Sequence, residues 1–118
     1  MRNKLVATVG AALLLALVPV SQAAAPTVTG TVGPGFTISL TKGGKKATTL
    51  KSVKVTFVIN DKSTFHNYEL DGPKGFEKKL TDVSFKGTKT ITLTLKPGTY
   101  KFYCAPHESS MFGHFKVS

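Results

Sequence analysis

The sequence is poor in cysteine, histidine, tryptophan and acidic residues. It has one cysteine, three histidines, no tryptophan, and 6 Asp+Glu against 16 Lys+Arg in 118 residues. One cysteine excludes an intramolecular disulfide, so its thiol is a buried apolar group, a reactive group, an intermolecular link or a metal ligand. Three histidines exclude multi-metal sites that consume many imidazoles. The length leaves room for a single hydrophobic core, so one domain is expected.

The N-terminus predicts a secretory signal peptide. Arg2 and Lys4 precede an apolar run from Leu5 to Val20, and Ser21-Gln22-Ala23 supplies the small residues that a signal peptidase reads. The run is shorter than the roughly 20 residues that a membrane-spanning helix needs, which favours cleavage over an uncleaved anchor. An oxidising compartment would also leave a free thiol open to oxidation, so the cysteine is expected to be protected.

Cleavage after Ala23 divides the chain into a signal peptide at residues 1–23 and a single domain at residues 24–118. We therefore expect a periplasmic or extracellular monomer with no membrane segment after cleavage. Without Arg2 and Lys4 the domain keeps 14 basic residues against 6 acidic ones, a charge of +8 compared with +10 for the whole chain. Positive charge favours acidic partners and speeds their encounter. The basic residues form no run with interleaved aromatics, so nucleic acid is not expected as a partner.

Apolar and polar residues alternate with a period of two along the domain, and no helical pattern of any length is present. Turn residues such as Gly33-Pro34-Gly35 and Pro97-Gly98 separate the alternating segments. The pattern predicts seven to nine strands in an antiparallel sandwich with crossed-over connections. The expected strands are 27–32, 36–40, 53–59, 66–70, 76–80, 83–85, 91–95, 99–104 and 112–117.

The segment from Cys104 to Met111 carries the strongest chemical signal. Strand parity directs Cys104 toward the core at the end of a strand, and Pro106 then forces a loop that can fold His107 and Met111 back toward the sulfur. Thiolate and thioether ligands favour copper. Two histidines, one cysteine and a weak axial methionine are the ligands of blue-copper electron-transfer sites.

This ligand set requires a second histidine, and His66 is the candidate. It follows the end of the strand predicted at residues 53–59, and neighbouring strand ends of a sandwich meet at one pole. His114 shares its parity with Phe112 and Lys116 on the last strand, so we expect it to face solvent.

Each of these residues has an ordinary structural interpretation when it is taken alone. A single cysteine is often a small core residue, and a methionine often fills a core. A histidine beside an aromatic ring is often a hydrogen-bonded structural group. Taken together, these interpretations do not explain why Cys104, His66, His107 and Met111 all fall at strand ends that a sandwich would bring together.

The segment Tyr103-Cys104-Ala105-Pro106-His107, followed by Met111-Phe112-Gly113 and preceded by His66-Asn67, resembles the cupredoxin family, and within it the plastocyanin, pseudoazurin and amicyanin group. The resemblance covers most of the domain, from Phe36 to Val117. It implies an all-β, Greek-key β-sandwich of about eight strands with one type 1 copper ion.

The resemblance also implies roles for individual residues. His66, Cys104 and His107 would be equatorial copper ligands, and Met111 the long axial ligand. Asn67 would tie the two ligand loops together. Two features depart from the family pattern. Three residues separate His107 from Met111, where members usually have two or four, and Phe65 replaces a proline that often precedes the first histidine.

The resemblance implies one-electron transfer between redox partners, with the edge of His107 as the electron port. Ala105, Pro106, Phe65, Met111 and Phe112 are expected to form an apolar collar around it. The expected partner is an acidic redox protein such as a cytochrome, an oxidase or a reductase domain.

Two other functional classes remain open. A copper carrier or scavenger could use the same ligands without electron transfer, and a metal-free binding sandwich would treat Cys104 as part of the core. An enzyme is not expected, because four protein ligands leave the copper no open position for substrate.

Overall fold

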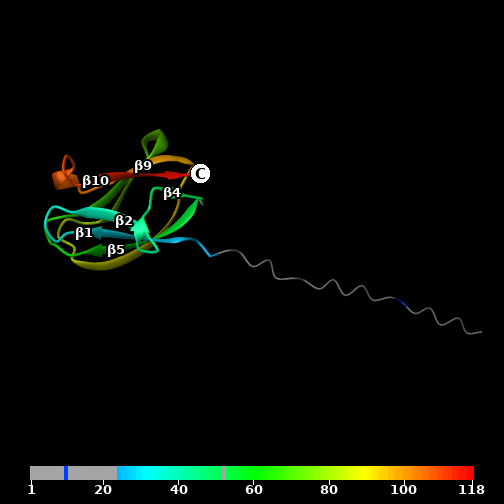
Figure 1. Cartoon of the computed structure of the whole chain (residues 1–118), viewed down its shortest axis with the longest axis horizontal. Helices are drawn as coiled ribbons and strands as arrows, with labels where there is room; N and C mark the ends of the chain where they lie inside the picture. Colours follow the sequence, from blue (N-terminus) through cyan, green and yellow to red (C-terminus); the bar gives the residue numbers. More distant parts are fainter. Residues whose placement is uncertain (1–9, 11–23, 52) are drawn as a thin grey trace, which may run out of the picture.

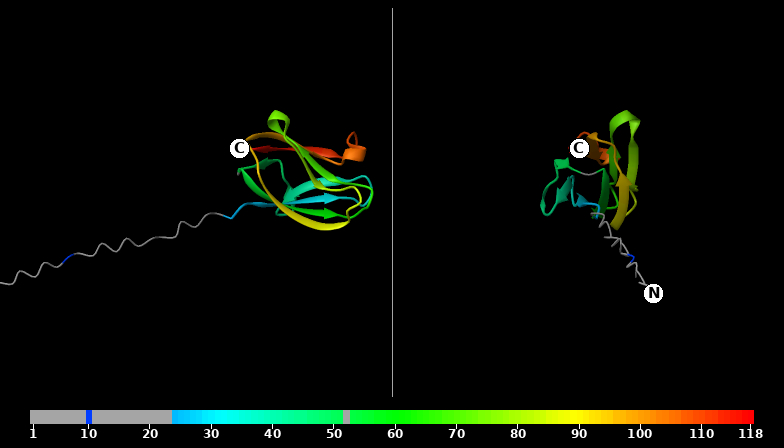
Figure 2. Two further views of the ribbon diagram at one scale, coloured as in Figure 1. Left: turned by 180° about the vertical axis from the view of Figure 1, so that it is seen from behind. Right: turned by 90° about the vertical axis from the view of Figure 1, so that its right-hand side faces the viewer.

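The structure is a computed structural model that describes residues 24–51 and 53–118, together with Gly10. The signal peptide predicted at residues 1–23 lies outside the described residues, apart from Gly10. In the described part of the chain ten strands form two stacked five-stranded sheets (Figures 1 and 2). Eight strands have four or more residues and two have two residues, so the predicted all-β sandwich of about eight strands is confirmed.

No helix within the described ranges is long and apolar enough to cross a lipid bilayer.

The first sheet has the order β3-β2-β1-β5-β8. Its strands are β1 (Thr27–Val32), β2 (Ile38–Lys42), β3 (Lys45–Lys46), β5 (Lys54–Asp61) and β8 (Gly87–Thr94). The second sheet has the order β4-β10-β9-β6-β7. Its strands are β4 (Thr49–Leu50), β6 (Tyr68–Asp71), β7 (Glu77–Thr81), β9 (Gly98–Tyr103) and β10 (Phe112–Val117), with short 3-10 turns η1 (Pro73–Gly75) and η2 (Ala105–His107).

The expectation of purely antiparallel pairing is wrong for two strand pairs. Strand β1 runs parallel to β5, and β10 runs parallel to β4. The parallel β1 and β5 pair arises because the chain crosses to the second sheet at β4 before it returns as β5. The predicted sandwich with crossed-over connections is confirmed, but each of its two sheets contains both parallel and antiparallel strand pairs.

Several predicted strands also differ from the structure. Residues 83–85 form no strand but a turn, in which the amide of Phe85 donates to the carbonyl of Asp82 at 3.0 Å. Strand β2 begins at Ile38, which leaves Phe36 in the preceding loop, and β6 begins at Tyr68. At the starts of β2 and β6 the loops take more residues than alternation indicates, whereas β8 begins at Gly87, four residues before the predicted start at Ile91.

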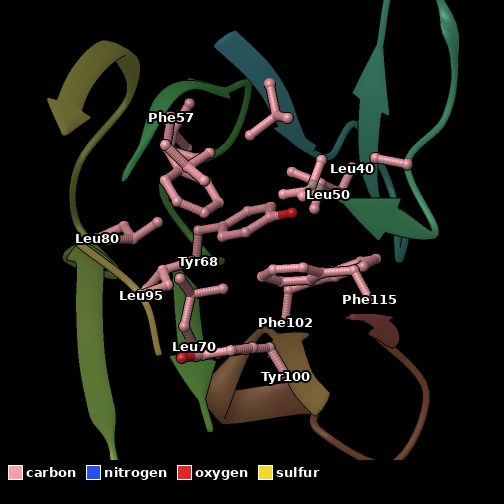
Figure 3. Packing of buried hydrophobic residues seen from close by; sticks show 14 of the residues in the cluster. Leu40, Leu50, Phe57, Tyr68, Leu70, Leu80, Leu95, Tyr100, Phe102 and Phe115 are labelled. Carbon is pink, nitrogen blue, oxygen red and sulfur yellow. The ribbon is translucent and has the colours of Figure 1, made fainter. Parts of the chain in front are cut away.

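The core lies between the two sheets and follows the predicted parity (Figure 3). Val55, Phe57 and Ile59 of β5 are fully buried. From the other sheet, Tyr68 stacks on Phe102 with ring centres 5.8 Å apart. The Tyr68 hydroxyl donates a hydrogen bond of 2.9 Å to the carbonyl of Ser39 in β2, so a polar contact joins the two sheets within the core.

The loop that carries Cys104, His107 and Met111 lies at the same pole of the sandwich as the loop between β1 and β2. The orange segment around residue 107 and the cyan loop between β1 and β2 lie at the same end in both Figure 1 and the left view of Figure 2. The chain enters β1 at the opposite end. The candidate site therefore lies at a loop-covered pole.

The space around Gly30 shows how tightly the two sheets are packed. A Cβ at this buried position would lie 2.6 Å from Ile59 Cδ1 and 2.8 Å from the ring of Tyr68. We expect Gly30→Ala to lower the free energy of unfolding by about 1–3 kcal/mol, because one of these side chains must shift in a packed core. Chemical denaturation would measure the change. Thr31→Ala, on the opposite face of the same strand, is the control, and equal stabilities for the two variants would contradict the packing described.

Candidate metal centre

The end of β9 and the following turn fold Cys104, His107 and Met111 onto one another. Cys104 is fully buried and follows the last residue of β9. The amide of His107 donates to the Cys104 carbonyl at 3.0 Å, and the amide of Met111 donates to the His107 carbonyl at 2.8 Å. The amide of Cys104 in turn donates to the Met111 carbonyl at 3.1 Å. These hydrogen bonds close the loop, and Met111 is fully buried.

His66 reaches the same pole from the loop after β5. The side chain of Asp61 begins this loop by accepting a hydrogen bond of 3.0 Å from the amide of Ser63. The Ser63 hydroxyl then accepts a 3.1 Å hydrogen bond from the amide of Phe65. These local turns place His66 at 4% exposure, whereas His107 is half-buried.

The three donor atoms of His66, Cys104 and His107 face one point. Cys104 Sγ lies 3.6 Å from His66 Nδ1 and 3.7 Å from His107 Nδ1. The two Nδ1 atoms are 3.1 Å apart. Ligands about 2.0–2.3 Å from one ion are at most about 4.3 Å apart. All three separations fit a single ion, and the described residues contain no second group of three His, Cys, Asp or Glu donors of this kind.

His114 does not take part in this cluster. It is exposed on β10, where it pairs with Lys101 across the strand register, so the prediction that it faces solvent is confirmed. Met111 was expected in the surface collar, and this prediction is wrong because its side chain is fully buried behind the loop.

Asn67 connects the two segments that carry the donors. Its side chain is 1% exposed, and its Oδ1 accepts a hydrogen bond of 2.8 Å from the amide of Ala105. Ala105 directly follows Cys104, and Asn67 directly follows His66. One hydrogen bond therefore joins residues adjacent to two of the three donors.

Sequence reasoning missed Phe36, which it assigned to the inward face of a strand. Phe36 is 66% exposed, and its ring packs edge-on against the rings of His107 and His66, at 4.9 and 5.6 Å between centres. The loop before it turns through Gly33 and Gly35, with φ of 70° and 71°, conformations that favour glycine. The Gly33-Pro34-Gly35 sequence was the available signal that the chain had not yet entered a strand.

An apolar depression of about 490 Å³ opens beside the two histidines. The ring of Phe65, 72% exposed, forms part of its wall. Among the residues that line it, none carries an Asp, Glu, Lys or Arg side chain. The lining consists of Gly35, Phe36, Ser63, Thr64, Phe65, His66, Val83, Pro106 and His107.

Two buried polar side chains near the site, Asp61 and Tyr103, have raised pKa values. Burial raises the pKa of the Asp61 carboxyl, while the amide of Ser63 and the nearby His66 oppose the shift. Burial also raises the pKa of the Tyr103 phenol, and its hydrogen bond to Asp71 adds to the shift. The Tyr103 hydroxyl therefore stays protonated and donates to Asp71 Oδ1 at 2.9 Å, which ties β9 to β6 next to Cys104.

Residues 37–118 match the model of a family described as copper binding proteins, plastocyanin/azurin family. No curated protein sequence matches the chain. Rusticyanin from Thiobacillus ferrooxidans is similar in structure, with a TM-score of 0.53, 25% identity, and coverage of 82% of this chain and 79% of that chain.

Two auracyanins share the fold at lower identity. Auracyanin A, a blue copper protein from Chloroflexus aurantiacus, has a TM-score of 0.54 at 19% identity, covering 78% of this chain and 98% of that chain. Auracyanin B has a TM-score of 0.52 at 16% identity, covering 82% and 93%. The family match and the converging donors lead to one conclusion: the chain belongs to the plastocyanin/azurin family of cupredoxins, and its cofactor is copper, in a type 1 site formed by His66, Cys104, His107 and Met111.

Proposed function

We propose that this protein is an exported one-electron carrier and not an enzyme. The observation that carries the proposal is the convergence of two imidazoles and a thiol at the edge of an apolar depression. Bound copper supplies one-electron chemistry by alternating between Cu(II) and Cu(I). Four protein ligands would leave no coordination position for a substrate, which argues against catalysis on a bound molecule.

The residues around the site favour electron transfer over bond making because they hold the donors in place. Cys104 and His66 are buried, and backbone hydrogen bonds close the Cys104 to Met111 loop. Donors that cannot move far between oxidation states keep the reorganisation energy low, and electron transfer is then fast. In this proposal His66, Cys104, His107 and Met111 would hold the copper ion.

His107 is the proposed electron port. It is half-buried and lines the apolar depression together with Phe36, Phe65 and Pro106. An uncharged rim of this kind suits the small, short-lived interfaces of redox encounters. A partner that docked over the depression would bring its own redox centre close to the imidazole edge.

The proposed partner is an acidic redox protein. The domain that would remain after cleavage at Ala23 has 14 basic and 6 acidic side chains, a charge of +8. Such a charge accelerates the encounter with an acidic surface without determining where it docks. The apolar depression would then select the docking orientation.

The ligand assignment predicts a specific loss of colour. We expect the protein with Cu(II) to show intense thiolate-to-copper absorption in the visible range, which Cys104→Ser abolishes and His66→Ala strongly alters. His114→Ala serves as the matched control, since this imidazole lies exposed on β10 and its removal should leave the spectrum unchanged. A colourless wild-type protein, or an unchanged spectrum in His66→Ala, would refute the assignment.

Asn67 is proposed to position the ligand loops. Asn67→Ala removes the hydrogen bond to the Ala105 amide and leaves that amide without this partner. Loss of such a supporting contact typically costs about 10- to 100-fold in metal affinity, and we expect a change in that range with the coloured site retained. Copper titration against a competing chelator measures it. Wild-type affinity in Asn67→Ala would show that the loops hold their position without this side chain.

Electron transfer with an acidic partner should depend steeply on salt. We expect the second-order rate of reduction by an acidic cytochrome to fall as the ionic strength rises from about 0.01 to 0.15 M, because the Debye length shrinks from about 30 to 8 Å. Stopped-flow kinetics would measure the rate, with a basic cytochrome as the control that should show no such fall. Slow, irreversible reduction combined with copper exchange within minutes would instead support a copper carrier or scavenger.

A further inference from the structure

Lys101 lies on the outer face of β9, three residues before Cys104. Its ammonium contacts three different side chains. Nζ is 2.9 Å from Glu108 Oε1, 5.1 Å from the centre of the Phe112 ring and 5.4 Å from the centre of the Tyr103 ring. A cation within about 6 Å of an aromatic ring centre is attracted to the face of that ring. One charged group thus holds an ion pair and two cation–π contacts.

Each of these contacts is made to the immediate neighbour of a copper-site residue. Tyr103 precedes Cys104, Glu108 follows His107, and Phe112 follows Met111. The strand register explains the placement, because Phe112 pairs directly with Tyr103 and their side chains lie on the same face of the hairpin. The ammonium of Lys101 therefore links both strands of the hairpin to the loop between them.

The link lies on the opposite side of the segment from the buried contacts. Strand parity directs Lys101 and Tyr103 outward, whereas Cys104 points inward to the site. Asn67 holds the amide of Ala105 from the buried side. The loop is held from its inner side by an amide oxygen and from its outer side by an ammonium.

We infer that Lys101 is a positioning residue for the copper site. Its ammonium restrains the Cys104 to Met111 loop and slows the loop opening through which copper leaves. The inference rests on the copper site and not on electron transfer, so it holds for a copper carrier as well. Three residues separate His107 from Met111, and Glu108 is the first of them. Its carboxylate is the group through which Lys101 contacts the loop.

The expected size of the effect follows from the exposure of the pair. Lys101 and Glu108 have side-chain exposures of 29% and 48%, so salt screens their attraction in part. With the two aromatic contacts included, loss of the ammonium should speed copper release about three- to tenfold. Loss of the carboxylate alone should speed it less, about two- to fourfold, because the cation–π contacts remain.

The test compares copper release from the loaded protein to a chelator in excess. We expect Lys101→Met, which keeps most of the apolar stem, to release copper about three- to tenfold faster than wild type. Lys101→Arg should stay within about twofold of wild type, because a guanidinium also pairs with carboxylates and packs on aromatic rings. Lys79→Met is the matched control, since its ion pair with Asp82 is exposed and lies outside the ligand loop.

Salt dependence separates positioning from a general loss of stability. Release from wild type should accelerate as salt is raised, whereas release from Lys101→Met should be nearly independent of salt. Glu108→Gln changes an exposed residue outside the strands. This variant should also make the rate of copper release less dependent on salt. Wild-type release rates and salt dependence in both variants would overturn the inference.

Hydrogen exchange in the copper-free protein provides a second readout. The amides of Ser110 and Met111 both donate to the His107 carbonyl, at 3.1 and 2.8 Å. We expect these amides to exchange faster in Lys101→Met than in wild type, with the amides of β5 unchanged. Equal exchange at Ser110 and Met111 would show that the loop is not restrained by Lys101. This result would leave the proposed electron transfer untouched.

Discussion

The hydrogen bond from the Ala105 amide to Asn67 Oδ1 is the contact on which the copper site most depends. It joins two segments that lie 38 residues apart in the chain. One segment directly precedes β6 and the other directly follows β9, and in each segment a donor residue is adjacent to the bonded residue. Because Asn67 is buried, water does not compete for this bond, and the spacing between His66 and Cys104 is set by the protein itself.

The same arrangement explains how a small domain keeps a free thiol. Cys104 is fully buried beside two imidazoles, and copper is the cofactor of the family to which the chain belongs. Binding of a metal to the folded state alone stabilises that state, so the ion both protects the sulfur and adds to stability. The ring of Phe36 packs edge-on against the two imidazoles at the surface, and backbone hydrogen bonds close the Cys104 to Met111 loop.

Much of this site could be predicted from the sequence because three of its four ligands are close together in the chain. Cys104, His107 and Met111 fall within one eight-residue loop, and period-two alternation was enough to direct Cys104 inward. The rest depends on long-range geometry. The parallel pairing of β1 with β5 follows from a crossing between sheets, and Phe36 reaches the site only because its loop turns before β2 begins. The contacts of Lys101 depend on the register of β9 with β10, which alternation along one strand does not contain.

The central claim is that the protein holds two imidazoles and one thiolate in fixed positions around copper in both oxidation states. X-ray absorption at the copper edge of the oxidised and the reduced protein tests it most directly. The account predicts one sulfur and two nitrogen scatterers at short distance in both states, with little change in distance between them. Absence of the short sulfur scatterer, or loss of a nitrogen ligand on reduction, would contradict it.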